Sequence, residues 1–270
     1  MRSISSRSWA RFTPFTCPKR GVIVEGSQLL PPAPEEGLDL LAVAPHPDDA
    51  EIGAGATLAL HVARGHRVGV LDLTRGELGT NGTPEERLAE AREAARVLGL
   101  AWRGNLGLPD RGLAPGSAQA AELVRVLRTL RPRVVLLPSG EDAHPDHRAA
   151  SLLAREAVMT AGLPRWDPST PAHRPRRVLY YFVDPPMAPS LLVDVSGHLD
   201  SKMRALRCHA SQFLAGPGRL PTVLNDGHYL ARVEAQARYL GASVGCEAAE
   251  PFRAAELPVL ADLVTWCPVA

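Results

Sequence analysis

From residue 38 onwards, short apolar runs alternate with longer amphipathic segments. Helix ends are marked by suitable residues: Thr83 can cap a helix that begins at Pro84, and Gly99 can end it. In chain order, we expect strands and helices to alternate over residues 40–44, 49–64, 67–73, 84–98, 101–105, 117–130, 133–137 and 145–161. This pattern is typical of βαβ units and predicts an α/β fold whose mostly parallel sheet has helices on both faces.

The remaining segments are less regular. Residues 105–113 hold too many turn-forming residues for a regular element, and residues 164–175 form a Pro-rich loop. Beyond that loop we expect two strands and two helices, at residues 178–183, 191–195, 197–209 and 226–240. We expect residues 38–270 to form a single α/β domain.

Residues 1–37 have a different composition. Their first acid is Glu25, which follows five basic residues, and they lack the apolar stretch of a secretory signal. An organelle transit peptide is the alternative, but Pro14 and Pro18 would interrupt its amphipathic helix. We therefore expect a disordered N-terminal extension.

Charge and cysteine content restrict the partners. A formal net charge of +1 offers no field for gathering nucleic acid or anionic lipid. No apolar run approaches the ~18 residues of a membrane span. The four cysteines are scattered without metal-ligand spacing, as in a reduced compartment. We expect a cytoplasmic protein without nucleic-acid or membrane partners.

Two motifs place imidazole and carboxylate groups after predicted strands. His46-Pro-Asp-Asp49 follows the first strand, and His144-Pro-Asp-His147 follows the fourth. Either motif alone could be an ordinary helix start, because Asp is a common N-cap. Together they lie at the carboxyl edge of a parallel sheet, where ligands collect, whereas the loops at the opposite edge are short and plain. Because burying these groups without a counter-charge would be costly, the motifs predict a metal site.

These residues suit metal-assisted hydrolysis. Such a site needs three nitrogen or oxygen ligands, an open position for water and a nearby acid or base. Of two adjacent carboxylates, Asp48 and Asp49, only one can readily bind the metal, so the other can accept a proton. Zn²⁺ is the default, but sites with two imidazoles and one carboxylate also accept Fe²⁺, Mn²⁺ or Co²⁺.

With both motifs placed, the chain resembles the LmbE/PIG-L superfamily of zinc-dependent N-acetylglucosamine deacetylases over about residues 38–260. Further segments resemble its bacillithiol-biosynthesis branch, whose members remove acetate from N-acetylglucosaminyl malate: residues 72–83, 105–113, 141–147, 208–213 and 225–229. The resemblance implies a Rossmann-like fold, a small GlcNAc-conjugate substrate and a homo-oligomer, either a trimer or a hexamer.

The resemblance also implies roles for individual residues. The matching metal ligands are His46, Asp49 and His147, and the matching general base is Asp48. His144 matches a cationic imidazole near the substrate carbonyl, and Asp146 the carboxylate that orients it. The expected substrate-binding residues are Arg87 and Asp110 for sugar hydroxyls, Arg111 for a malate carboxylate, Asn81, and His209, where some relatives carry Tyr.

Other functions stay open at this point. Within the deacetylase interpretation, other GlcNAc conjugates are rival substrates. A nucleotide-binding α/β protein is a second possibility, but Gly53-Ala-Gly55 lacks a third glycine because position 58 is Leu58. A non-catalytic carbohydrate-binding or metal-sequestering module is a third, although it would need neither a free Asp48 nor an oriented His144.

Overall fold

The computed structural model describes residues 29–184, 188–257, 259–262 and 267–268. The strands are β1 (Leu40–Ala44), β2 (Val68–Thr74), β3 (Trp102–Leu108), β4 (Val134–Pro138), β5 (Arg177–Tyr181), β6 (Leu191–Asp194), β7 (Ala249–Ala254), β8 (Leu260–Asp262) and β9 (Cys267–Pro268). The helices are α1 (Asp49–Ala63), α2 (Pro84–Leu98), α3 (Ala118–Leu130), α4 (Pro145–Ala161), α5 (Leu199–Cys208), α6 (Ala210–Phe213) and α7 (Tyr229–Val244).

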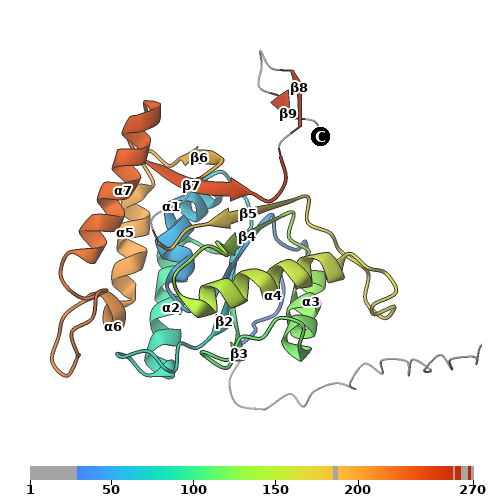
Figure 1. Ribbon diagram of the computed structural model, residues 1–270, viewed down its shortest axis with the longest axis horizontal. Coiled ribbons are helices and arrows are strands. Elements are labelled where there is room, and N and C mark those ends of the chain that lie inside the picture. The colour runs from blue at the N-terminus through green and yellow to red at the C-terminus, as the bar shows by residue number, and fades with distance from the viewer. Residues whose placement is uncertain (1–28, 185–187, 258, 263–266, 269–270) are drawn as a thin grey trace, which may run out of the picture.

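Seven strands form one sheet in the order β3–β2–β1–β4–β5–β7–β6 (Figure 1). Strands β1 to β5 are parallel, and β7 runs antiparallel to both β5 and β6. The chain proceeds outward from β1 to β3 on one side and then continues from β4 on the other. This reversal opens a crevice outside the carboxyl ends of β1 and β4. The predicted Rossmann-like α/β fold is confirmed.

The helices cover both faces of the sheet. Helices α3 and α4 pack together on one face, and α1, α2 and α5 pack together on the other (Figure 1). Alternate side chains of β1 point to opposite faces, so that Leu41 and Val43 enter the α3–α4 core while Leu40 and Ala42 enter the other. Because both faces are covered, the central strands are apolar throughout.

Some predicted elements need correction. Strand β3 continues to Leu108, into the stretch that we expected to be irregular. Strand β7 was not expected, because its sequence Ala-Glu-Pro-Phe-Arg-Ala contains a proline and two charged residues. It is nevertheless buried, and the carboxylate of Glu250 accepts from Lys202 Nζ at 2.7 Å. Because Glu250 is buried through an ion pair with a distant residue, β7 lacks the apolar pattern by which a buried strand is predicted from sequence.

The expected boundary of the N-terminal extension also changes. Residues 1–28 of the predicted disordered segment lie outside the described residues, but residues 29–37 pack on the folded body. The carbonyl oxygen of Leu29 accepts from Asn105 N at 2.7 Å, and that of Pro31 accepts from Trp102 Nε1 at 3.2 Å. No helix in the described part of the chain is long and apolar enough to cross a membrane.

Candidate active site

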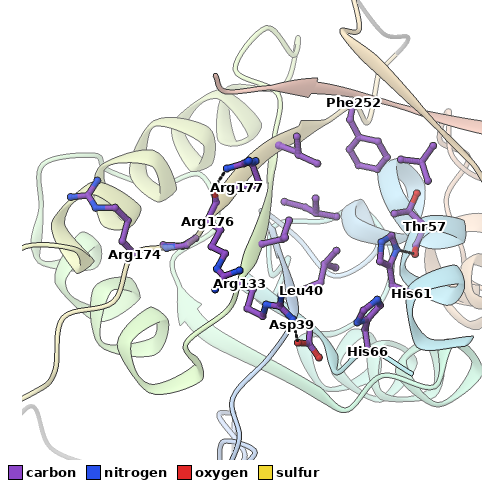
Figure 2. Close-up of a pocket in the computed structure, with 15 residues that line it drawn as sticks. Asp39, Leu40, Thr57, His61, His66, Arg133, Arg174, Arg176, Arg177 and Phe252 are labelled. Atoms are coloured by element: carbon purple, nitrogen blue, oxygen red, sulfur yellow. Dashed lines mark hydrogen bonds and ion pairs between the residues drawn. The ribbon is translucent and has the colours of Figure 1, made fainter. Parts of the chain in front are cut away.

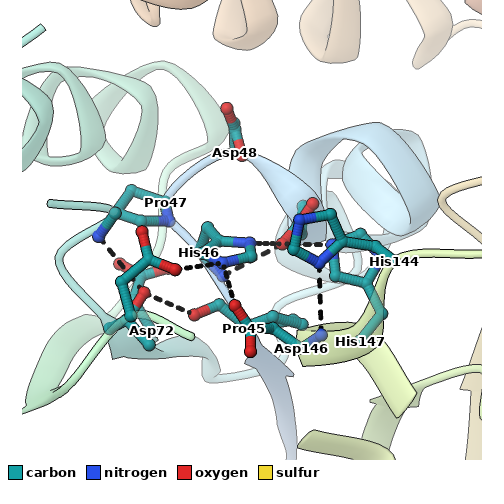
Figure 3. A network of polar contacts seen from close by, with 12 residues as sticks. Pro45, His46, Pro47, Asp48, Asp72, His144, Asp146 and His147 are labelled. Carbon is teal, nitrogen blue, oxygen red and sulfur yellow. Dashed lines mark hydrogen bonds and ion pairs between the residues drawn. The ribbon is translucent and has the colours of Figure 1, made fainter. Parts of the chain in front are cut away.

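Both motifs lie in the crevice between β1 and β4. His46 follows β1, and His144 precedes α4, whose first turn contains Asp146 and His147. The ring centroids lie 5.1 Å apart for His46 and His144 and 4.6 Å apart for His144 and His147. Figure 3 shows the three rings gathered with Asp146 below them. Residues about one hundred positions apart thus share one site.

A buried triad has the geometry of a metal site. Asp49 Oδ2 lies 3.0 Å from His46 Nδ1 and 3.3 Å from His147 Nε2. In tetrahedral coordination with bonds of 2.0–2.1 Å, ligand atoms lie about 3.3 Å apart. One atom from each of the three residues lies within 4.8 Å of the others. The triad could therefore hold one divalent cation.

A second set of groups shares His46. One atom each from His46, His144 and Asp146 also lies within 4.8 Å of the others. In this set, however, Asp146 Oδ2 already accepts from Arg111 N at 3.0 Å, and His144 Nδ1 accepts from Asp146 N at 3.2 Å. His144 is also less buried than each of the three residues of the first set. The His46–Asp49–His147 set is therefore the better candidate.

Asp142 orients one ligand of this triad. Its Oδ2 lies 2.9 Å from His147 Nδ1, and its Oδ1 accepts from His144 N at 2.7 Å. A carboxylate beside Nδ1 favours the tautomer that carries its proton there, which leaves the lone pair of Nε2 directed at a metal. In the sequence, Asp142 is one residue of the matching segment 141–147 and was not expected to have a role of its own. Its position as an acid two residues before a His-x-x-His motif could have indicated that it supports a ligand.

Carboxylates outnumber imidazoles around the triad. The four acids are Asp49, Asp110, Asp142 and Asp146. Burial lowers the pKa of His46, but contacts with three of these acids outweigh it and raise the pKa well above its usual value. Burial likewise opposes protonation of His147, yet Asp49 and Asp142 raise its pKa to about 10. The site therefore needs positive charge, which protons or a divalent cation can supply.

Asp48 has a strained backbone beside the triad. Its φ of 125° and ψ of −29° lie in a sparsely populated region for a residue other than glycine. Burial raises the pKa of the Asp48 carboxyl to about 6, although the nearby Arg87 guanidinium lowers it. A carboxylate that titrates near neutral pH is suited to accept and release a proton.

Arg87 contacts the protein rather than the open side of the site. Its Nη2 donates to the carbonyl oxygen of Pro47 at 2.9 Å and to Asp48 Oδ2 at 3.3 Å, and its Nη1 donates to the carbonyl oxygen of Gly76 at 3.0 Å. The side chain is buried. These contacts hold Asp48 in place, and the expected role of Arg87 in binding sugar hydroxyls stays a prediction.

The contact between His144 and Asp146 differs from our expectation. The backbone N–H of Asp146 donates to His144 Nδ1, whereas its carboxylate oxygen lies 3.4 Å from His46 Nε2. Burial and the neighbouring imidazoles lower the pKa of His144, which opposes the cationic form that we expected. With Nδ1 accepting, the proton lies on Nε2. His144 can still donate to a substrate oxygen.

Comparison with known proteins identifies the family. The PIG-L family model, described as GlcNAc-PI de-N-acetylase, matches residues 41–158, which include both motifs. A diacetylchitobiose deacetylase from Thermococcus kodakarensis is 35% identical over 189 residues, which cover 64% of this chain and 70% of the relative. This chain belongs to the PIG-L family.

Two further relatives extend the comparison. A 1D-myo-inositol 2-acetamido-2-deoxy-alpha-D-glucopyranoside deacetylase from Geodermatophilus obscurus is 36% identical over 163 residues, covering 48% of this chain and 55% of that protein. The crystal structure of a conserved protein from Thermus thermophilus is 47% identical, with a TM-score of 0.75, and the match covers 84% of this chain and 98% of the other. The likeness to this solved structure thus covers nearly its full length and extends beyond residues 41–158 of this chain.

Two of the expected substrate-binding residues lie at the site of this PIG-L family member. Asp110 Oδ1 lies 3.2 Å from His46 Nε2, and Asp110 Oδ2 accepts from Leu78 N at 3.0 Å. Burial disfavours the charged form of Asp110, but these contacts outweigh it and hold its pKa below the usual value. Arg111 has a positive φ of 60°, and its side chain is exposed.

Asn81 and His209 have other surroundings. Asn81 Nδ2 donates to the carbonyl oxygen of Leu220 at 2.9 Å, and Asn81 Oδ1 accepts from Leu220 N at 2.8 Å, so its amide joins two loops. His209 is fully buried, with Nε2 3.4 Å from a carboxylate oxygen of Glu51. The Asn81 amide is thus engaged within the protein, both ring nitrogens of His209 lack a hydrogen-bond partner among the described residues, and the expected substrate contacts of both residues stay predictions.

An ion cluster lies beneath the first turn of α1. Arg103 donates to both carboxylate oxygens of Asp72, from Nε and Nη2, at 3.0 Å each, and also donates to Glu51. All three side chains are buried. Burial opposes ionisation of Glu51, but Arg103 and His209 reverse this effect and lower its pKa. We had not singled out Arg103, although a charged residue within a buried strand was a usable signal.

Proposed function

We propose that this protein is a metal-dependent hydrolase that removes the N-acetyl group from a GlcNAc conjugate. The observation that carries the proposal is the buried His46–Asp49–His147 triad together with a second buried carboxylate, Asp48, which interacts electrostatically with Asp49 and His46. A site that only sequesters metal would gain nothing from an acid beside the ligands that has a strained backbone and a raised pKa. A hydrolase needs such a group.

The triad fits a resident divalent cation, for which we propose Zn²⁺. Two imidazoles and one carboxylate at near-tetrahedral separations are ligands that zinc prefers, and Fe²⁺, Mn²⁺ or Co²⁺ can use the same set. When bound, the ion would supply a Lewis acid that makes water a nucleophile near neutral pH.

The protein's own groups would move the protons. Asp48, held by Arg87, would accept a proton from the attacking water and pass it to the amine leaving group. His144 would donate from Nε2 to the carbonyl oxygen as negative charge develops there, and loss of one such donor typically costs ~3–4 kcal/mol. Amide hydrolysis would thus be divided between a base, Asp48, in the turn after β1 and a donor, His144, in the loop after the neighbouring strand β4.

For the group attached to GlcNAc, we propose malate. The relatives named above act on diacetylchitobiose and on an inositol conjugate of acetamidoglucose, which supports a GlcNAc conjugate in general. The bacillithiol-type segment at residues 105–113 and the exposed Arg111 support an anionic aglycone, because a guanidinium binds carboxylates in a bidentate manner. We also propose a cytoplasmic homo-oligomer, trimer or hexamer, which light scattering can test.

Acetate release tests the function. N-acetylglucosaminyl malate, diacetylchitobiose, the inositol conjugate and free GlcNAc are compared with and without a chelator. Asp48→Asn should retain the metal and lose more than about 100-fold in turnover, because no base is left to accept the proton. His147→Ala should lose the metal. Asp200→Asn, on the exposed surface of α5, is the matched control and should leave both properties unchanged.

Two outcomes would contradict parts of the proposal. Undiminished acetate release in the presence of the chelator would exclude a metal mechanism. Faster release from diacetylchitobiose or the inositol conjugate than from the malate conjugate would reject malate while leaving the deacetylase activity intact.

A further inference from the structure

A second cavity lies at the opposite edge of the sheet from the triad. It has a volume of about 1030 Å³ and lies at the amino ends of β1, β4 and β5 (Figure 2). Because five-residue strands span about 15 Å, the strands separate it from the metal ligands. Small-molecule sites occupy ~300–1,000 Å³, so this cavity has room for a ligand of that size.

The inner surface of this cavity is apolar. Leu40, Leu136, Leu179 and Phe252 line it from four different strands, and Val193 extends the apolar surface. Thr57 of α1 lines the wall, and its buried Oγ1 has no hydrogen-bond partner among the described residues. The inner part therefore favours a hydrocarbon or aromatic group over a sugar.

The rim carries basic side chains. Arg133, Arg176 and Arg177 line one side of the cavity, with His61 and His66 on the other, whereas the Arg174 guanidinium points away from it and contacts Met159 of α4 (Figure 2). The acid among the lining residues, Asp39, already accepts from Arg67 N at 2.9 Å and from Arg133 Nη1 at 3.3 Å. Because Arg133 and Arg176 stand against this one acid among the lining residues, the rim carries local positive charge in a chain whose net charge is only +1.

We propose that this cavity binds a small organic anion whose apolar body enters the pocket and whose carboxylate or phosphate group meets the arginines at the rim. Guanidinium groups bind both anions in a bidentate manner. The chain's own N-terminal residues do not suit the site, because the residues before Glu25 carry five basic side chains and no acid. The proposal is independent of the proposed deacetylase function.

Titration calorimetry on the full chain tests the proposal with three probes of equal alkyl length. Octanoate and octyl phosphate should bind at least about tenfold more tightly than 1-octanol, and the stronger anion identifies the preferred headgroup. The double variant Arg133→Gln/Arg176→Gln should weaken anion binding about tenfold or more. Arg155→Gln removes an exposed arginine of α4 that does not line the cavity and should leave binding unchanged.

A second variant tests the apolar part of the cavity. Leu179→Trp narrows the apolar part of the cavity and should weaken binding of all three probes while metal content stays normal. Binding should also be equal with and without a chelator, because the carboxylate probe could otherwise have bound at the triad.

Three results would overturn the proposal. Equal affinity for 1-octanol and octanoate would show that the arginines at the rim do not contribute to binding. Loss of anion binding in the presence of the chelator would show that the anion binds at the metal centre rather than in this cavity. Hydrogen exchange that showed this surface protected in an oligomer, together with no anion binding, would assign the cavity to a second copy of the chain.

Discussion

Replacing Asp142 with Asn should weaken metal binding without disturbing the loop that carries it. The amide oxygen can still accept from His144 N, a contact that measures 2.7 Å in the structure. The amide nitrogen then faces His147 Nδ1, where the carboxylate oxygen lay 2.9 Å away. A donor facing a donor favours the tautomer with the proton on Nε2, which has no lone pair for the metal.

The expected magnitude follows from this geometry. Loss of a carboxylate that supports a ligating imidazole typically costs 10–100-fold in affinity, or about 1.4–2.7 kcal/mol. We expect the upper end for Asp142→Asn, because the substitution both removes a charge and reverses the hydrogen-bond polarity. The acid-to-amide change alters the volume very little, so the effect should not arise from packing.

A metallochromic chelator that competes for the ion measures this affinity, and acetate release at saturating metal measures the remaining activity. The control is Glu141→Gln, which removes the neighbouring charge and its 2.8 Å ion pair with Arg253 but does not contact His147. If Asp142→Asn bound metal within twofold of the unmodified protein, the orienting role of Asp142 would be refuted. Equal losses in both variants would point to general electrostatics instead.

Further predictions concern stability. Arg103→Met leaves the buried acids Glu51 and Asp72 unpaired and should lower the free energy of unfolding by about 3–5 kcal/mol in urea titrations. Asn81→Ala removes both contacts to Leu220, should cost about 1–3 kcal/mol, and should speed proteolytic cleavage near residue 220. In metal-free protein, the pKa of His147 is raised to about 10, so its stabilising contribution is complete below about pH 6.5 and is lost as pH rises through 10. The melting temperature of chelator-treated protein should therefore fall over this range, and a flat profile would contradict this electrostatic account.

The sequence by itself was enough for most of the architecture. Helix α2 begins at Pro84 and ends at Leu98, as predicted, because Thr83 and Gly99 specify its ends locally. Strand β1 is likewise found where its apolar run predicted it. The alternation of strands and helices, together with the rule that ligands collect at the carboxyl ends of parallel strands, was enough to expect both motifs in one crevice.

Only the tertiary structure decided what several side chains do. The family resemblance pointed to Arg87 and Asn81 as substrate ligands, and the structure adds hydrogen bonds from both side chains to residues up to 139 positions away. The role of Asp142 and the burial of β7 also depend on distant partners. Residue type limits the bonds that a side chain can make, whereas the packed chain determines which partner is within reach, and no local pattern records that choice.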